Sequence, residues 1–275
     1  MFDYSEEALR RYSRHILLPD VGVEGQERIR QGRVLVVGAG GLGSPVLLYL
    51  AAAGVGHLGI VDGDVVDLSN LQRQVIHATP DVGHYKVESA RQQIIRLNPD
   101  VCVTTYREWL TPDNAADLVS AYDFVVDGTD NFATKFLVND ACVMAGRPFS
   151  IGGLLRYDGQ AFTHLPGTAC YRCLFEAAPP AGTVPTCSQA GVLGAVAGML
   201  GTIQAAEVLK YLTGAGTLLT DCLLTLDALT MEFRKTTLSR RDDCAVCGSR
   251  PSVTTLAITE PETCLMGRGP LSSHG

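Results

Sequence analysis

The chain has 275 residues, of which 46% are hydrophobic and 19% charged, and its 22 basic and 29 acidic side chains give a formal net charge of −7. This composition excludes a disordered chain and argues against a general nucleic-acid or anionic-membrane binder, because either needs a basic surface. The longest nearly unbroken apolar stretch, 191–203, is shorter than the ~20 residues that span a bilayer, and the first residues lack a signal-peptide pattern, so we expect a cytoplasmic protein.

The order of the predicted elements is that of an α/β protein. A helix that ends before Pro19 comes first, and apolar strands then alternate with helices as far as residue 151. We predict strands at 33–37, 57–61, 101–106, 123–126 and 148–151, and helices at 44–54, at 87–97, from 112 and at 131–146. Such alternation indicates parallel strand pairing with helices on both faces of a sheet.

From residue 152 the pattern becomes typical of antiparallel strands. We predict a hairpin at 154–165, a long helix from about 188 to 212, and strands at 218–226 and 232–238. No linker or repeat divides the chain, so we expect a single domain over 1–250 and a mobile C-terminal tail over 251–275. The predicted fold class is α/β: a Rossmann-like, mostly parallel sheet with helices on both faces, continued by an antiparallel C-terminal portion and, for the reasons below, a zinc clip.

A glycine-rich turn follows the first predicted strand. Gly38, Gly40 and Gly43 fit the G-x-G-x-x-G spacing before a helix that Ser44 is predicted to cap. Glycines here let backbone N–H groups approach a phosphate at a helix N-terminus. Asp62 ends the next strand, where a carboxylate accepts a hydrogen bond from a ribose hydroxyl. These residues predict a nucleotide site and leave NAD, FAD, S-adenosylmethionine and ATP open.

The segment after this carboxylate favours a triphosphate. It holds a cluster of polar residues: Ser69, Asn70, Arg73 and Gln74. Lys86 begins the next predicted helix, and Asp127-Gly-Thr-Asp130-Asn131 lies at the carboxyl end of a strand, where open α/β sheets bind ligands. A guanidinium, an ammonium and a carboxylate available for Mg²⁺ suit a triphosphate that is attacked at its α-phosphorus. Taken singly, Arg73 is as readily a surface charge and Lys86 an ordinary first-turn lysine.

Four of the nine cysteines form two Cys-x-x-Cys pairs, Cys170 with Cys173 and Cys244 with Cys247. One such pair alone could be a redox pair, whereas four thiolates make a closed tetrahedral zinc site. A predicted proline-rich loop, 166–185, contains the first pair. We predict one structural zinc ion per chain, which ties this loop to the C-terminal end of the body.

Other residues that can carry chemistry are assigned no role in catalysis. Three further cysteines are expected to be small core residues: Cys102, Cys142 and Cys222. His57 and His77 are more typical of hydrogen-bonded structural groups. Trp109 and the scattered tyrosines form no stacking platform.

Several segments resemble the MoeB/ThiF/HesA family, bacterial relatives of ubiquitin-activating enzymes. They are RYSRHILLPDVGVEGQ from Arg11, VLVVGAGGLGSP from Val34, DVVDLSNLQRQ from Asp64, DGTDN from Asp127 and PTCSQAGVLG from Pro185, together with the two Cys-x-x-Cys pairs. The resemblance covers residues 4–248, with the motifs in the family's order. One departure is His15, where glutamine is expected, and it bears on the fine placement of Arg14.

The resemblance implies ATP-dependent adenylation of the C-terminal glycine of a small ubiquitin-like sulfur-carrier protein ending in Gly-Gly. Pyrophosphate is released, and the carrier serves cofactor biosynthesis of the molybdopterin or thiamin type. Of the residues implied to bind ATP, Asp62 holds the ribose and Asp130 positions Mg²⁺. The whole set is Gly38, Gly40, Gly41, Gly43, Asp62, Ser69, Asn70, Leu71, Gln72, Arg73, Lys86, Asp130 and Asn131.

The catalytic residues implied by the resemblance are Arg14, Arg73, Lys86, Asp130 and Cys187. Arg14 reaches into the partner subunit's phosphate site, so we expect a homodimer. The attacking carboxylate is already ionised at neutral pH, so catalysis is mainly positioning and electrostatics. In some members the cysteine at the place of Cys187 is linked covalently to the carrier and in others adenylation does not depend on it, so both roles stay open. We expect the sulfur to come from a separate sulfurtransferase, a cysteine desulfurase or sulfide.

Two other functions stay open. A Rossmann-type NAD-dependent oxidoreductase explains the segment 38–62 but leaves the segment 69–74, Lys86 and Asp130 without a role. A zinc-stabilised nucleotide-binding scaffold without turnover has no physical need for all four of the residues Arg14, Arg73, Lys86 and Asp130. No nucleic-acid or membrane partner is expected.

Overall fold

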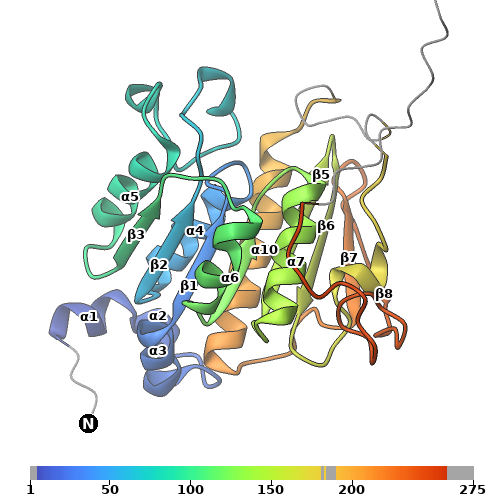
Figure 1. Cartoon of the computed structure of the whole chain (residues 1–275). Coiled ribbons are helices and arrows are strands. Elements are labelled where there is room, and N and C mark those ends of the chain that lie inside the picture. The colour runs from blue at the N-terminus through green and yellow to red at the C-terminus, as the bar shows by residue number, and fades with distance from the viewer. Residues whose placement is uncertain (1–4, 181–182, 184–189, 259–275) are drawn as a thin grey trace, which may run out of the picture.

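In the computed structural model, which describes residues 5–180, 183 and 190–258, eight strands form one continuous sheet (Figure 1). The strands are β1 (Arg33–Val37), β2 (His57–Val61), β3 (Cys102–Tyr106), β4 (Phe124–Asp127), β5 (Phe149–Leu155), β6 (Asp158–His164), β7 (Cys222–Asp227) and β8 (Glu232–Thr237). Their order across the sheet is β3-β2-β1-β4-β5-β6-β7-β8. Neighbours from β3 to β5 pair in parallel and those from β5 to β8 pair antiparallel, which confirms the predicted Rossmann-like sheet with an antiparallel C-terminal portion.

Helices cover both faces of this sheet. They are α1 (Glu6–Arg11), α2 (Ser13–Ile16), α3 (Gly22–Gln31), α4 (Gly43–Ala53), α5 (Lys86–Leu97), α6 (Pro112–Ser120), α7 (Phe132–Met144), α8 (Tyr171–Leu174) and α10 (Gly194–Thr213), with short 3₁₀ helices η1 (Leu68–Asn70) and η2 (Thr79–Asp81). On one face α10 packs against α4, α3 and β5, and α4 packs against α5; on the other face α6 and α7 pack together (Figure 1).

The central strand β1 is buried on both sides, as a strand between two helical layers must be. Val34 and Val36 belong to the cluster beneath α4, α5 and α10. Leu35 and Val37 belong to the cluster beneath α6 and α7. Because successive side chains of a strand point to opposite faces, burial on both faces explains why the sequence of β1 is a continuous apolar run. The glycine turn follows directly after this buried strand.

The N-terminal part of the fold differs from the prediction. Ser5 caps α1 by accepting a hydrogen bond from the N–H of Ala8 at 3.1 Å, and the predicted single helix breaks at Tyr12 into α1 and α2. The helix α3 was not predicted, because its two glycines and its charged residues give a weak pattern. Ile29 is buried, and α3 packs against α10, so tertiary packing outweighs low intrinsic propensity here.

Two further expectations change in the second half. The predicted strand at 148–151 continues through Gly152 and Gly153 to Leu155, and all of it pairs with β6. Gly152 lies close to α10, since a Cβ there would be 2.6 Å from Gln204 Oε1. The expectation that Cys102 lies in the core is wrong: β3 is an edge strand and Cys102 is exposed. Across the described ranges, none of the helices is both long enough and apolar enough to cross a membrane.

Candidate functional site

The glycine turn after β1 is built by close backbone contacts. Gly38 has a φ of +93° and donates its N–H to Val61 O at 2.8 Å. A Cβ at Gly43 would lie 1.8 Å from Gly38 O, whereas one at Gly40 would meet its nearest atom, Gln74 Nε2, at 3.6 Å. Gly43 is therefore required for the turn itself, and Gly40 leaves space in front of it.

The helix α4 starts from this turn without a side-chain cap. It begins at Gly43 with Leu42 as N-cap, so the prediction that Ser44 caps it is wrong. Ser44 already lies in the first turn, where its N–H bonds Gly40 O at 2.9 Å. A helix N-terminus with no side-chain cap favours an anionic ligand at its N–H groups.

Asp62 lies beside the glycine turn at the end of β2, with 6% of its surface exposed. Its Oδ2 accepts the N–H of Ala39 at 2.8 Å and its Oδ1 accepts the N–H of Asp64 at 2.9 Å. Burial raises the pKa of Asp62, against the opposing effects of these N–H groups and of Lys86. The two backbone hydrogen bonds fix the carboxylate at the position where a ribose would lie.

The loop between β2 and α5 places two cations. Asp67 caps η1 by accepting the Ser69 N–H at 2.8 Å, and Arg73 Nη1 donates to Ser69 O at 3.1 Å. Lys86 is 6% exposed, and its Nζ donates to Asp64 Oδ2 at 2.6 Å. Partial burial acts to raise the pKa of Asp64, but the hydrogen bond from Lys86 helps to outweigh burial, and the pKa is lowered. This carboxylate therefore holds the ammonium at the site before any ligand arrives.

The turn after β4 holds one buried and one exposed carboxylate. Asp127 is fully buried, and it accepts hydrogen bonds from Lys135 Nζ and Thr129 Oγ1 at 2.6 Å each. Asp130, three residues on, is exposed. Asn131 is the N-cap of α7 and accepts the N–H of Thr134 at 2.8 Å. Asp127 thus fixes the turn, and Asp130 remains available to a ligand.

These elements enclose a cavity of about 230 Å³ at the carboxyl ends of the parallel strands. It is lined by nine of the residues predicted to bind ATP: Gly38, Gly40, Gly41, Asp62, Asn70, Arg73, Lys86, Asp130 and Asn131. Four others are not among its lining residues, and their contact with a nucleotide stays a prediction: Gly43, Ser69, Leu71 and Gln72. Gln72 instead lies against Gly194, where a Cβ would meet Gln72 O at 2.2 Å.

Arg14 lies far from the cavity of its own chain. Its neighbour Tyr12 packs against Gly54, at the C-terminal end of α4, where a Cβ would lie 2.4 Å from the Tyr12 hydroxyl. The glycine turn is at the other end of this helix, about 16 Å away at 1.5 Å per residue. Figure 1 shows α2 at the opposite end of the sheet from the loops around the cavity.

A larger cavity of about 670 Å³ adjoins the first one. Its walls are the N-terminal end of α7 and the strands β5 to β8, with apolar contributions from Phe132, Leu154 and Leu226. Four residues line both cavities: Thr129, Asp130, Asn131 and Leu154. Asp130 therefore lies where the two spaces meet.

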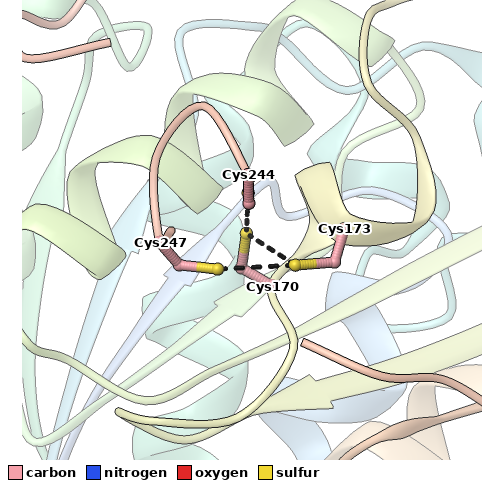
Figure 2. A group of neighbouring side chains, drawn as sticks. All are labelled: Cys170, Cys173, Cys244 and Cys247. Atoms are coloured by element: carbon pink, nitrogen blue, oxygen red, sulfur yellow. Dashed lines mark hydrogen bonds between the residues drawn. The ribbon is translucent and has the colours of Figure 1, made fainter. Parts of the chain in front are cut away.

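The four predicted zinc ligands converge at the end of the antiparallel portion (Figure 2). The sulfur atoms of Cys170 and Cys244 lie 3.6 Å apart, those of Cys173 and Cys247 3.4 Å apart, and all four lie within 4.8 Å of one another. A tetrahedral zinc ion with Zn–S bonds of 2.3 Å needs sulfur–sulfur distances of about 3.8 Å. Burial and the neighbouring thiols raise the pKa of Cys170, which a bound cation would reverse.

Buried polar contacts fix the first cysteine pair to α7. Arg172, between Cys170 and Cys173, donates to both carboxylate oxygens of Asp140 at 2.7 and 2.8 Å. The N–H of Tyr171 donates to Asn139 Oδ1 at 2.7 Å. The helix that begins beside Asp130 thus also supports the cysteine cluster.

Two residues at the site were missed by the sequence prediction. Lys135 bonds Asp127, Thr129 O and Gly152 O, and the only signal for it is its position one turn into the helix after Asp127–Asn131. Trp109 lines the smaller cavity, and its signal is its place after β3, at the same edge of the sheet as the other strand ends. Cys187 lies outside the described residues, so its predicted role is untested.

Known proteins resemble this chain along most of its length. A profile of the ThiF family matches residues 12–246. The chain is 49% identical over 261 residues to the probable adenylyltransferase/sulfurtransferase MoeZ of Mycobacterium tuberculosis, covering 93% of this chain and 65% of MoeZ. It is 49% identical over 255 residues to the sulfur carrier protein adenylyltransferase of Thermus thermophilus, covering 90% and 94%. Among solved structures, MccB of E. coli has a TM-score of 0.78 at 22% identity over 90% of this chain and 76% of MccB, which supports the fold alone.

Proposed function

The chain belongs to the ThiF family, as its motifs predict, and from this membership and the geometry of its cavities we propose that it adenylates the C-terminal glycine of a small ubiquitin-like sulfur-carrier protein ending in Gly-Gly. ATP is the second substrate and pyrophosphate the leaving group. The observation that carries this proposal is that Arg73, Lys86 and Asp130 line one cavity with the glycine turn. The relative from Thermus thermophilus, matched over 94% of its length, is named an adenylyltransferase of a sulfur carrier protein.

The reaction asks the chain to bring two anions together. A carboxylate oxygen of the carrier's last glycine attacks the α-phosphorus of ATP, and the bond from that phosphorus to the β-phosphate bridging oxygen breaks. The Arg73 guanidinium and the Lys86 ammonium neutralise charge on the phosphates. Because Asp64 already holds Lys86 Nζ in place at 2.6 Å, little reorganisation is needed when the nucleotide binds.

Mg²⁺ fits the donor set at the junction of the two cavities. The exposed Asp130 offers hard oxygen ligands beside the phosphate site, whereas Asp127 is already paired with Lys135. Asp130 is the residue that would hold the ion, which would supply charge neutralisation at the β- and γ-phosphates.

The larger cavity is the place for the carrier's C-terminal tail. An extended Gly-Gly end in this space would approach the smaller cavity at the shared wall of Thr129, Asp130 and Leu154. Its carboxylate would then meet the α-phosphate of an ATP molecule whose phosphates lie over the glycine turn.

The proposal has four further parts, which concern the metal, the domain, the assembly and the sulfur donor. One zinc ion held by Cys170, Cys173, Cys244 and Cys247 is structural, because four thiolates leave no open coordination position. The adenylyltransferase domain is 1–250. The protein acts in the cytoplasm as a homodimer, in which Arg14 of one subunit completes the phosphate site of the other. A sulfurtransferase or a cysteine desulfurase supplies the sulfur.

Carrier-dependent exchange of labelled pyrophosphate into ATP tests this function. Asp130→Ala should abolish the exchange, while the matched variant Asp117→Ala, on the exposed surface of α6, should retain it. NADH binding without exchange would favour the dehydrogenase alternative. ATP binding without exchange, tested with carrier candidates ending in Gly-Gly, would favour a scaffold without turnover.

A further inference from the structure

Four parallel strands end side by side around the nucleotide cavity. In sheet order β3 leads to the segment 107–110, β2 to Asp62, β1 to the glycine turn and β4 to Asp130. If the phosphates lie over the glycine turn and toward Asp130, and the ribose lies at Asp62, the base must extend to the other side of the ribose. That side is the end of β3.

Trp109 presents its ring at this place. It is 62% exposed and lines the same cavity as Asp62. Its ring lies directly over the backbone of Gly63, the residue after Asp62: a Cβ there would lie 2.8 Å from Trp109 Cε2 and 2.9 Å from Nε1. Residue 63 therefore has to be glycine for the indole to occupy this position.

The backbone of this segment is fixed by the start of α6. Asn114 Nδ2 donates to Trp109 O at 2.9 Å, and Asn114 Oδ1 accepts the N–H of Thr111 at 2.8 Å. Leu110 is buried in the core beneath α6. The ring is thus held at the mouth of the cavity by an anchored backbone, with one side against Gly63.

We propose that Trp109 forms a wall of the base site and stacks on the adenine of ATP. A large aromatic surface that water otherwise covers gains most by stacking on a second flat ring, and a purine offers more area than a pyrimidine. Trp109 is then a residue that determines nucleotide specificity. The proposal rests on the proposed function only in taking ATP as the nucleotide.

The fluorescence of the whole protein tests this directly. The chain contains one tryptophan, so the emission reports on this ring alone. Titration with ATP in the absence of carrier should change the Trp109 emission along the binding curve that calorimetry measures. Inorganic tripolyphosphate, which carries the phosphates without a base, should leave the emission unchanged even at concentrations where it displaces ATP.

Variants separate stacking from a structural role. Trp109→Ala should raise the KM for ATP in carrier-dependent exchange about tenfold, the effect expected for loss of one base–aromatic stack, and leave kcat within about twofold. It should also reduce the preference for ATP over CTP, and Trp109→Phe should restore most of both. The matched control is Tyr49→Ala, which removes a ring that is 58% exposed on α4 and does not line the cavity.

A second substitution, at Gly63, tests the position of the same ring. Gly63→Ala should displace the indole and raise the KM for ATP in the wild-type background, and it should add little to Trp109→Ala because the group it displaces is already gone. Full additivity of the two changes would contradict the proposal.

The failure of this proposal is distinguishable from failure of the proposed function. If calorimetry shows ATP binding while the Trp109 emission stays constant and Trp109→Ala binds ATP as the wild type does, the stacking proposal is wrong and adenylation stands. If the wild type does not bind ATP at all, both the proposed function and the proposed adenine site are wrong.

Discussion

Lys135 Nζ donates to Asp127 Oδ2 at 2.6 Å, and both side chains are almost completely buried beneath the turn that carries Asp130. The same ammonium donates to Thr129 O at 2.7 Å and to Gly152 O at 2.5 Å. Three acceptors from β4, the following turn and β5 thus converge on one cation. The position of Asp130 therefore depends on a buried charge pair beneath the turn.

Removal of this ammonium should destabilise the fold strongly. Lys135→Met leaves the Asp127 carboxylate buried and unpaired, a change that typically costs about 3–5 kcal/mol. Urea unfolding followed by circular dichroism measures the loss. Arg234→Met is the control, because the Arg234–Glu232 pair on β8 is exposed at 70% and 60% and should contribute nothing measurable. Equal stability of Lys135→Met and the wild type would show that the buried pair is unimportant.

Two glycines of the same turn should respond differently to alanine. Gly43→Ala places a Cβ 1.8 Å from Gly38 O, so the turn must open and the fold should lose about 1–3 kcal/mol, as overpacked sites do. Gly40→Ala meets its nearest atom at 3.6 Å and should keep the wild-type stability. It should instead weaken ATP binding, since its methyl group occupies the cavity. Unfolding midpoints and calorimetric ATP titrations measure the two effects, and an equal loss of stability in both variants would contradict this division.

The sequence predicted those parts of the site whose chemistry is local. The sequence places the glycine turn, Asp62 and Asp130 at or just after the ends of strands, and the carboxyl ends of parallel strands meet at one edge. Arg73 and Lys86 belong to the segment that leads from β2 to the start of α5. The spacing of the cysteines likewise predicted which four would meet.

What the sequence did not predict depends on contacts between distant segments. In the sequence, Lys135 cannot be told from an ordinary helical lysine. Its role depends on an acceptor from a distant segment, Gly152 O of β5. The ring of Trp109 can occupy its position only because Gly63, which lies far earlier in the sequence, has no side chain. The helix α3 has a weak pattern and forms by packing on α10. The exposure of Cys102 depends on strand order, which the sequence does not show. β3 lies at the edge of the sheet, where it has a neighbouring strand on one side only.

Removal of a single thiol should prevent binding of the proposed zinc ion. Cys170→Ser should lower the zinc content of the purified protein well below one equivalent per chain and lower its thermal unfolding temperature, because a buried four-thiolate site contributes directly to folding. Metal analysis by mass spectrometry measures the first effect. The control is Cys102→Ser, which removes an exposed thiol outside the cluster. The assignment would be contradicted if wild-type protein, purified without chelators, contained no zinc.

Stability should fall as the pH drops below about 6.5, in part because of His77. Its Nδ1 lies 2.8 Å from Ser89 Oγ and its Nε2 3.0 Å from Ala39 O. Burial lowers the pKa of His77; Ala39 O, Asp81 and Asp62 act in the opposite direction and Lys86 adds to the lowering. The unfolded chain then takes up a proton near pH 6.5 that the folded chain takes up only at lower pH. The stabilisation is complete above the unfolded pKa and is lost as the pH falls through the folded one.

Urea unfolding at pH 7.5 and 5.5 measures this dependence. The difference in unfolding free energy between the two pH values should be smaller in His77→Gln than in the wild type, because glutamine keeps a donor and an acceptor and does not titrate. The comparison within each variant removes the pH-independent effect of the substitution. An identical pH difference in both proteins would assign the acid sensitivity to other groups.

Arg14 and Asp130 of one chain should act in different sites of the proposed homodimer. Arg14→Ala and Asp130→Ala should each abolish exchange as pure proteins. In a mixed dimer, one site combines the intact Asp130 of the first variant with the intact Arg14 of the second, and the other site lacks both groups. After co-refolding at equal amounts, half of the dimers are mixed and half of their sites are intact, so about a quarter of the wild-type exchange should return. Arg14 near the far end of α4 cannot serve its own cavity, so the absence of any recovery would show that it has no part in the reaction across the interface.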